Sequence, residues 1–217
     1  MAYDLEEQEQ LATLKAIWKQ YGNLVTWGVI VALVIYSAWT GWSNYQSKQS
    51  AQASQLYAEL QKSLELKDDA KVQRAANDLK GRFPGTAYSS MGALIAAKSA
   101  FDSSHLDVAK NQLQWVLTSG NVGEYKSLAQ IRLASLALDE KSYDEALRQL
   151  SGDFPIELQA EVLDKKGDVY FAQSKFAEAH SAYQTAMEKM TDKNPGRRLL
   201  QIKLDATEPE MTNVASK

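Results

Sequence analysis

The sequence predicts an all-α protein in which a single N-terminal transmembrane helix precedes a stack of about four helical hairpins and a capping C-terminal helix. Three observations predict this class: an uncharged stretch of 28 residues near the N-terminus, a remainder rich in Ala, Leu, Gln, Glu and Lys, and small and aromatic residues that recur every 33 to 37 residues. Alternating Val, Ile and Thr runs, which would indicate strands, are missing from the sequence.

The composition limits the chemistry. The 217 residues carry 24 basic and 27 acidic side chains, which gives a formal net charge of −3. A protein that binds nucleic acid through phosphate contacts carries an excess of basic side chains, and this chain has none. Because there is no cysteine, disulfides, thiolate catalysis and cysteine-based metal sites are excluded. We therefore expect no nucleic-acid partner and no cofactor.

Residues 1–19 are predicted to form a short cytoplasmic segment. Apolar side chains recur at helical spacing in and just after it: Leu11, Leu14, Trp18 and Tyr21. An amphipathic helix on the membrane surface and the first turns of one long helix fit this spacing equally well. The segment carries four acidic side chains against Lys15 and Lys19, unlike the basic start of a cleaved signal peptide, so we predict an uncleaved anchor.

Residues 20–47 are predicted to be the transmembrane signal anchor. A helix of this length reaches about 40 Å, against a hydrocarbon thickness of about 30 Å. Eight aliphatic residues form its membrane-spanning core: Leu24, Val25, Val29, Ile30, Val31, Leu33, Val34 and Ile35. The alternative is a buried helix of a soluble protein, but such a helix rarely runs so far without a charge. Lys15 and Lys19 on one side, against Lys48 alone close on the other, favour a cytoplasmic N-terminus.

Residues 48–204 are predicted to form the repeat domain, and residues 205–217 a mobile tail without an apolar period. Glycine and proline clusters separate the helices. We place these helices near residues 50–66, 69–82, 87–101, 105–118, 124–138, 142–150, 155–172, 175–190 and 196–204. The helix that leaves the membrane and the last helix would cap the two ends of the stack.

The last hairpin carries the most informative pattern. Its small and aromatic residues fall on the signature positions of the tetratricopeptide repeat, a helical hairpin of about 34 residues. These positions are occupied by Gly167, Tyr170, Ala179, Tyr183 and Ala186. The small residues let two helices approach closely, and the aromatic rings fill the groove to the neighbouring hairpin.

Earlier hairpins share this frame with smaller side chains. Steps of 33, 37 and 37 residues back from Gly167 reach Ala134, Ala97 and Leu60. Alanine at helical spacing also occurs in ordinary bundles, so a plain bundle fits the first two hairpins equally well.

No enzymatic motif is present in the sequence, and we expect no enzyme. His105 and His180 have no second histidine at metal-ligand spacing. One alternative is a hydrolase that uses Asp164 and Asp168, which share a helix face; it requires both side chains to point into a cleft.

A stack of hairpins offers instead a concave face along the first helix of each pair, which suits an extended peptide or a partner's helix. The repeat frame gives five candidates for this partner-binding face: Ser127, Gln130, Gln159, Leu163 and Lys166.

Motifs at both ends of the chain resemble a known family. They are Glu9-Gln10-Leu11 with Lys15, Trp18 and Tyr21-Gly22-Asn23, then Gly41-Trp42-x-x-Tyr45, and the closing Leu200-Gln201-Ile202-Lys203-Leu204-Asp205. In this order around a repeat domain they are similar to the YfgM family, the single-pass ancillary subunits of the bacterial SecYEG translocon. The resemblance implies an inner-membrane protein with a cytoplasmic N-terminus and a periplasmic repeat domain.

The same resemblance implies contact with SecYEG and with a PpiD-like membrane chaperone, and a part in handing newly exported, unfolded client proteins to periplasmic folding factors. The family has no catalytic residues to transfer. We thus expect a membrane-anchored periplasmic adaptor of the export channel, in contact with membrane lipid. The alternative is a repeat-domain scaffold for a different cell-envelope complex, in division or outer-membrane assembly.

Overall fold

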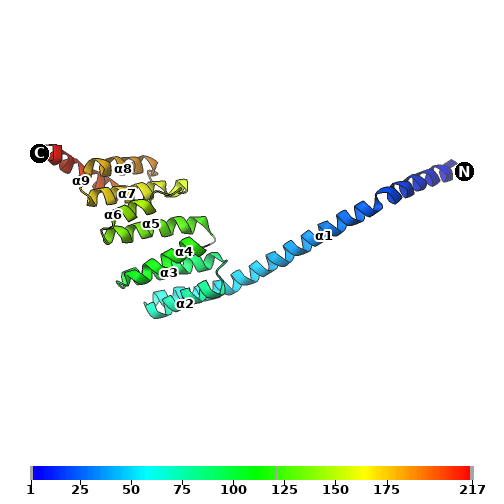
Figure 1. Ribbon diagram of the computed structural model, residues 1–217, viewed down its shortest axis with the longest axis horizontal. Helices are drawn as coiled ribbons and strands as arrows, with labels where there is room; N and C mark the ends of the chain where they lie inside the picture. The colour runs from blue at the N-terminus through cyan, green and yellow to red at the C-terminus, as the bar shows by residue number, and fades with distance from the viewer. Residues whose placement is uncertain (1, 121, 216–217) are drawn as a thin grey trace. The chain divides into compact units, whose positions relative to one another are not determined.

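The computed structural model describes the backbone of residues 2–120 and 122–215, and the side chains of residues 10–208 except Leu14, Ile17 and Asn121. All regular structure in these ranges is helical, which confirms the predicted class (Figure 1). The helices are α1 (Ala2–Glu65), α2 (Asp69–Arg82), α3 (Ala87–Asp102), α4 (Leu106–Ser119), α5 (Gly123–Asp139), α6 (Tyr143–Gln149), α7 (Gln159–Ala172), α8 (Phe176–Lys189) and α9 (Arg197–Ala215), with a 3₁₀ turn at Ile156–Leu158.

The chain divides into two compact units, Met1–Gln49 and Ser50–Lys217. In the first unit, α1 is long and apolar enough to cross a membrane by length and composition. The eight aliphatic side chains of the predicted core are between 44% and 74% exposed. Thr26 and Thr40 donate their hydroxyl hydrogens to backbone carbonyls one turn earlier, so both hydroxyls are satisfied within the helix.

The residues before the anchor belong to the same helix. Because α1 is helical from Ala2 onward, the described part of residues 5–19 forms the first turns of one long helix. The predicted helix 50–66 is likewise the last part of α1, whose residues Ala53 and Leu60 are fully buried in the core of the second unit.

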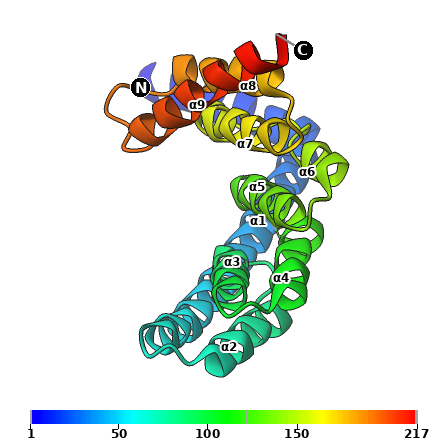
Figure 2. The same ribbon diagram turned by 90° about the vertical axis from the view of Figure 1, so that its left-hand side faces the viewer.

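The second unit is a stack of antiparallel helices in chain order. Each helix from α2 to α6 contacts the next, and α7 contacts α8, which contacts α9. Contacts of α5 with both α3 and α7 join the first helices of successive hairpins into one layer, and α4 and α6 lie beside that layer (Figure 2). This two-layer order is what a repeat architecture requires, because each hairpin buries its apolar face only against its neighbours.

The four turns inside the hairpins share one backbone geometry. Each contains a non-glycine residue with a positive φ between 54° and 62°: Lys67, Ser104, Lys141 and Ser174. In each turn the next residue donates its backbone N–H to a carbonyl five residues earlier, for example Asp68 to Ser63 at 2.9 Å and Ser142 to Ala137 at 2.7 Å. This bond is the Schellman closure of a helix end. The turns therefore repeat 37, 37 and 33 residues apart, in step with the sequence frame.

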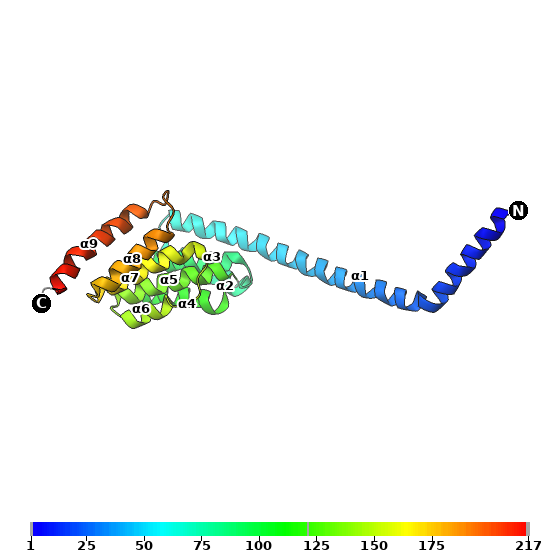
Figure 3. The same ribbon diagram turned by 90° about the horizontal axis from the view of Figure 1, so that it is seen from above.

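The helix ends predicted between residues 69 and 190 differ from the observed ends by at most one residue, except where the 3₁₀ turn precedes α7. The end of α9 differs more. The sequence places it at Leu204, whereas the helix continues to Ala215 (Figure 3). The reason is tertiary: Thr207 is fully buried, and its hydroxyl lies 2.8 Å from His180 Nδ1 of α8. This contact holds the first turn beyond Leu204 against α8.

Candidate interaction surface

The signature residues of the last hairpin lie where α7 meets α8. Gly167 stands so close to the Tyr183 ring that a Cβ at this position would overlap it. Ala179 and Ala186 are fully buried, and Tyr183 is 2% exposed. Tyr170 is half-buried and packs against the same cluster. The absence of a side chain at Gly167 is therefore what lets the ring lie flat between the helices.

The two aspartates of the hydrolase alternative hold α9 in place. Lys203 Nζ of α9 lies 2.7 Å from Asp164 Oδ1 and 2.7 Å from Asp168 Oδ1, both on α7. Tyr183 donates its hydroxyl hydrogen to Asp168 at 2.9 Å. About four fifths of each charged side chain is shielded from solvent. Both carboxylates are paired with the ammonium group of Lys203, so in the described part of the chain they join α7, α8 and α9.

This cluster shifts two pKa values. Burial alone would lower the pKa of Lys203, but its hydrogen bonds to Asp164 and Asp168 outweigh that effect and raise the pKa. Burial and the negative charge of Asp168 raise the pKa of Tyr183. Both groups therefore keep their protons throughout the neutral range.

Other side chains that could bind an anion or a metal ion were also located in the structure. Arg197 donates from Nη1 to the carbonyls of Met187 at 3.0 Å and Met190 at 2.9 Å, which satisfies carbonyls at the end of α8. His105 is exposed and stands at the N-terminus of α4. Within the described ranges, no three His, Asp or Glu side chains are arranged to hold a metal ion.

The predicted partner-binding face is brought together only in part. Gln159, Leu163 and Lys166 line one depression of about 260 Å³, and Leu163 and Lys166 also line a second of about 480 Å³ toward α8. Gln130 lies beside Gly152, at the edge of the first depression. Ser127 is buried and its hydroxyl bonds back to the Gly123 carbonyl at 3.4 Å, so it takes no part in this surface.

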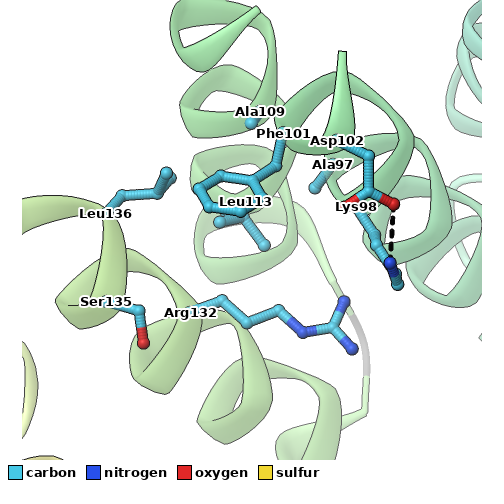
Figure 4. A pocket seen from close by; sticks show the side chains of 9 residues that line it. All are labelled: Ala97, Lys98, Phe101, Asp102, Ala109, Leu113, Arg132, Ser135 and Leu136. Atoms are coloured by element: carbon cyan, nitrogen blue, oxygen red, sulfur yellow. Dashed lines mark hydrogen bonds and ion pairs between the residues drawn. The ribbon is translucent and has the colours of Figure 1, made fainter. Parts of the chain in front are cut away.

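Sequence reasoning missed an apolar cavity between α3, α4 and α5 (Figure 4). Its volume is about 350 Å³. It is lined by Ala97, Lys98, Phe101, Asp102, Ala109, Leu113, Arg132, Ser135 and Leu136. One sequence signal could have found it: Leu113 occupies the frame position at which the last hairpin has Tyr183, so the groove is less completely filled here.

The polar groups of this cavity lie at its rim. Lys98 and Asp102 form an ion pair at 2.6 Å, one turn apart on α3. Arg132 donates from Nη1 to the Leu94 carbonyl at 2.9 Å. Burial lowers the pKa of Arg132, and the negative charge of Glu161 works in the opposite direction. The guanidinium remains charged, since its ordinary pKa lies far above neutrality.

The surface features described above are an exposed apolar helix, two shallow depressions and an apolar cavity. Comparisons with known proteins match nearly the whole length of the chain. The family model of the tetratricopeptide repeat-like domain matches residues 15–208, a range that includes the apolar part of α1. This match confirms the predicted tetratricopeptide repeat-like fold.

Curated relatives cover the same extent. A protein of Neisseria gonorrhoeae named ancillary SecYEG translocon subunit is 33% identical over 95% of this chain and 99% of its own length. Proteins with the same name from Aggregatibacter actinomycetemcomitans and Haemophilus influenzae are 25% and 26% identical, over 94% and 87% of this chain and 99% and 92% of their own lengths. The chain therefore belongs to the tetratricopeptide repeat-like family of which these ancillary translocon subunits are members.

Proposed function

We propose that this protein is a membrane-anchored adaptor of the SecYEG protein-export channel. The observation that carries the proposal is the end-to-end match with relatives named ancillary SecYEG translocon subunit, which includes both the apolar helix and the helical stack. The occupied aspartate pair of α7 and the absence of a catalytic motif from the sequence support an adaptor rather than an enzyme.

The proposed location is the bacterial inner membrane. α1 spans it once between residues 20 and 47, with residues 1–19 in the cytoplasm and residues 48–217 in the periplasm. The exposed aliphatic side chains of α1 support the span, and the positions of Lys15, Lys19 and Lys48 support the orientation. Membrane lipid covers whatever part of this helix does not contact the channel.

The anchor acts by proximity. A tether holds the stack near the channel exit at an effective concentration that can reach about millimolar for short linkers, so weak contacts become occupied. The partners we propose for the stack are a PpiD-like membrane chaperone and unfolded client proteins that leave the channel. Hand-over of a client then needs only shallow surfaces, such as the depressions lined by Leu163 and Lys166.

In-cell photocrosslinking tests the channel contact. A photoreactive amino acid is placed one at a time at Val29, Leu33 and Tyr36, which are all exposed on α1. The main product is expected to be a SecYEG subunit. Asp144, an exposed residue of α6, serves as the matched control outside the anchor. A main product from a division or outer-membrane assembly complex would contradict the proposal and support the scaffold alternative.

A second experiment tests the chaperone link. Photoreactive residues at Gln159 and Lys166 are expected to crosslink to a membrane-anchored periplasmic chaperone during active export, and to lose this product when export is blocked. If the products are the same with and without export, the hand-over role is contradicted while the channel contact stands.

A further inference from the structure

The cavity between α3, α4 and α5 combines an apolar interior with the positive charge of Arg132, which also interacts with the negative charge of Glu161. Phe101, Leu113 and Leu136 face its centre, and the Arg132 guanidinium extends toward the side where Lys98 and Asp102 lie (Figure 4). Phe101 is 44% exposed, whereas Ala97 and Ala100 of the same helix are 2% exposed. Exposed aromatic surface around a hollow is typical of a binding site, because a soluble repeat gains nothing by leaving it open.

The size of the cavity indicates what can enter. A volume of about 350 Å³ is at the lower end of ligand pockets, which begin at about 300 Å³. It is large enough for one large apolar side chain. An aromatic ring would bury most of its surface against Leu113, Leu136 and the wall formed by Phe101.

The rim indicates what lies next to that side chain. Among the residues that the structure describes, no carboxylate forms an ion pair with Arg132, whereas Lys98 and Asp102 neutralise one another. Only one of the nitrogens of Arg132 is used, in the bond to the Leu94 carbonyl. The remaining donors form the fork that binds a carboxylate with two parallel hydrogen bonds. An acidic group therefore complements the rim.

We infer that this cavity is a receptor for one large apolar side chain in an extended segment of a client polypeptide, followed directly by an acidic residue whose carboxylate pairs with Arg132. The open rim, with Asp102 as acceptor and Lys98 as donor, lets the segment continue on both sides of the anchored residue. The inference rests on the proposed function for the source of the client, but its test does not involve the channel.

The test uses the full chain in lipid nanodiscs and a synthetic peptide. The peptide consists of glycine and serine around one 4-fluorophenylalanine followed by one glutamate, with both ends blocked. Binding is measured from the broadening of its fluorine resonance, and empty nanodiscs correct for partition into lipid. The peptide is expected to bind about threefold more tightly than its glutamine counterpart, the size of a partly exposed ion pair.

Variants of the chain identify the site. Arg132→Gln removes the positive charge; it is expected to abolish the preference for glutamate and to leave the glutamine peptide unaffected. Arg132→Lys keeps the charge but loses the two-bond fork, so it should keep only part of the preference. Ser135→Leu fills the cavity and should weaken both peptides. The matched control is Arg198→Gln, which removes one exposed charge from α9, outside every surface depression described above, and should change neither affinity.

Circular dichroism verifies that each variant is folded. Equal affinity for the two peptides, or unchanged binding in Ser135→Leu, would overturn the inference. So would tighter binding of a peptide in which fluorophenylalanine is the last residue with a free carboxylate, because the site would then recognise a chain end. Self-association of the protein that Ser135→Leu abolishes would assign the cavity to a second copy and would also overturn it. None of these results alters the expected crosslinks of the anchor.

Discussion

At Gly167 the backbone of α7 lies directly against the Tyr183 ring of α8. The same kind of approach at Gly92 places a Cβ within 2.7 Å of Leu79, whereas nothing lies within 4 Å of a Cβ at Gly81. Gly167 and Gly92 therefore allow a close approach of a neighbouring helix, whereas Gly81 is not required for packing.

Gly167→Ala is expected to destabilise the stack by about 2 kcal/mol, because the new Cβ forces the ring or the helix to shift. Gly81→Ala is the matched control; it should stabilise α2 by up to about 1 kcal/mol, since alanine favours the helix and meets nothing. Urea unfolding followed by circular dichroism measures both. In Gly167→Ala/Tyr183→Leu the total loss should be smaller than the sum of the single losses; additive losses would show that the ring is not the obstacle.

At the scale of one element, α9 is held by charge as well as by apolar packing. Leu200 is buried among α8 side chains, and Lys203 reaches Asp164 and Asp168 of α7. Leu199 and Ile202, on the other side of the helix, are 58% and 57% exposed. The ion cluster thus favours the orientation of α9 in which Leu200, rather than Leu199 and Ile202, is buried.

Lys203→Met is expected to lower the free energy of unfolding by about 2 kcal/mol, because two shielded carboxylates lose their only shared cation. The value stands below that of a fully buried pair since a fifth of each side chain remains exposed. The control Lys98→Met removes the exposed ion pair with Asp102 and should change the free energy of unfolding by less than about 0.5 kcal/mol. In Lys203→Met, amide hydrogen exchange should accelerate in α9 and not in α5. Equal acceleration in both helices would contradict the prediction that the ion cluster stabilises α9 locally.

The same cluster predicts a loss of stability in alkali. The pKa values of Lys203 and Tyr183 are both raised in the folded state. Their contribution is therefore complete below the unfolded pKa values of about 10.4 and about 10, and is lost as the pH rises above them. The urea midpoint should fall between about pH 10 and about pH 12. Lys203→Arg keeps its charge and should show a smaller fall; an identical fall would assign the effect to other groups.

At the scale of the whole molecule, the boundary between the two units lies inside one helix. Residues 24–35 contribute nothing to the core of the stack, but Ala53 and Leu60, later in α1, are fully buried in it. The last part of α1 therefore belongs to the stack and covers the first of its hairpins.

Removal of residues 1–47 should thus leave a folded, helical fragment that stays in the supernatant when membranes are sedimented. Removal of residues 1–65 is the matched control; it exposes the apolar surface that Leu60 and Ala53 cover, and the product should unfold at lower temperature or aggregate. Sedimentation and circular dichroism distinguish the two. Continued co-sedimentation of the shorter truncation with membranes would contradict anchoring by α1.

Much of this architecture could be predicted from the sequence because its signals are local. Pro84, Gly120 and Gly152 lie just after the ends of α2, α4 and α6, where such residues mark a helix end in the sequence, and Gly167 marks a close approach of two helices. The predicted helix positions in the stack therefore agree with the structure to within a residue at most ends.

What could not be predicted depends on partners far away in the sequence. α9 continues past Leu204 because Thr207 meets His180, 27 residues earlier, and the polar residues after Leu204 carry no sign of it. Asp164 and Lys203 are in contact although they lie 39 residues apart in the sequence. The repeat spacing of the sequence does not predict such a pair. The apolar cavity likewise depends on how much space three helices leave between them. Leu113 at the frame position of Tyr183 indicates a less filled groove, but the spacing of the helices is set by contacts far apart in the sequence.

The four equal hairpin turns have an evolutionary consequence. At one edge of the stack, each bend is closed by the same left-handed residue and the same hydrogen bond, so an added or deleted residue would break it. The connections 83–86 and 190–196, at the opposite edge, differ in length and do not share this closure. Insertions in relatives, and tags introduced by an experimenter, should consequently be tolerated along that second edge alone.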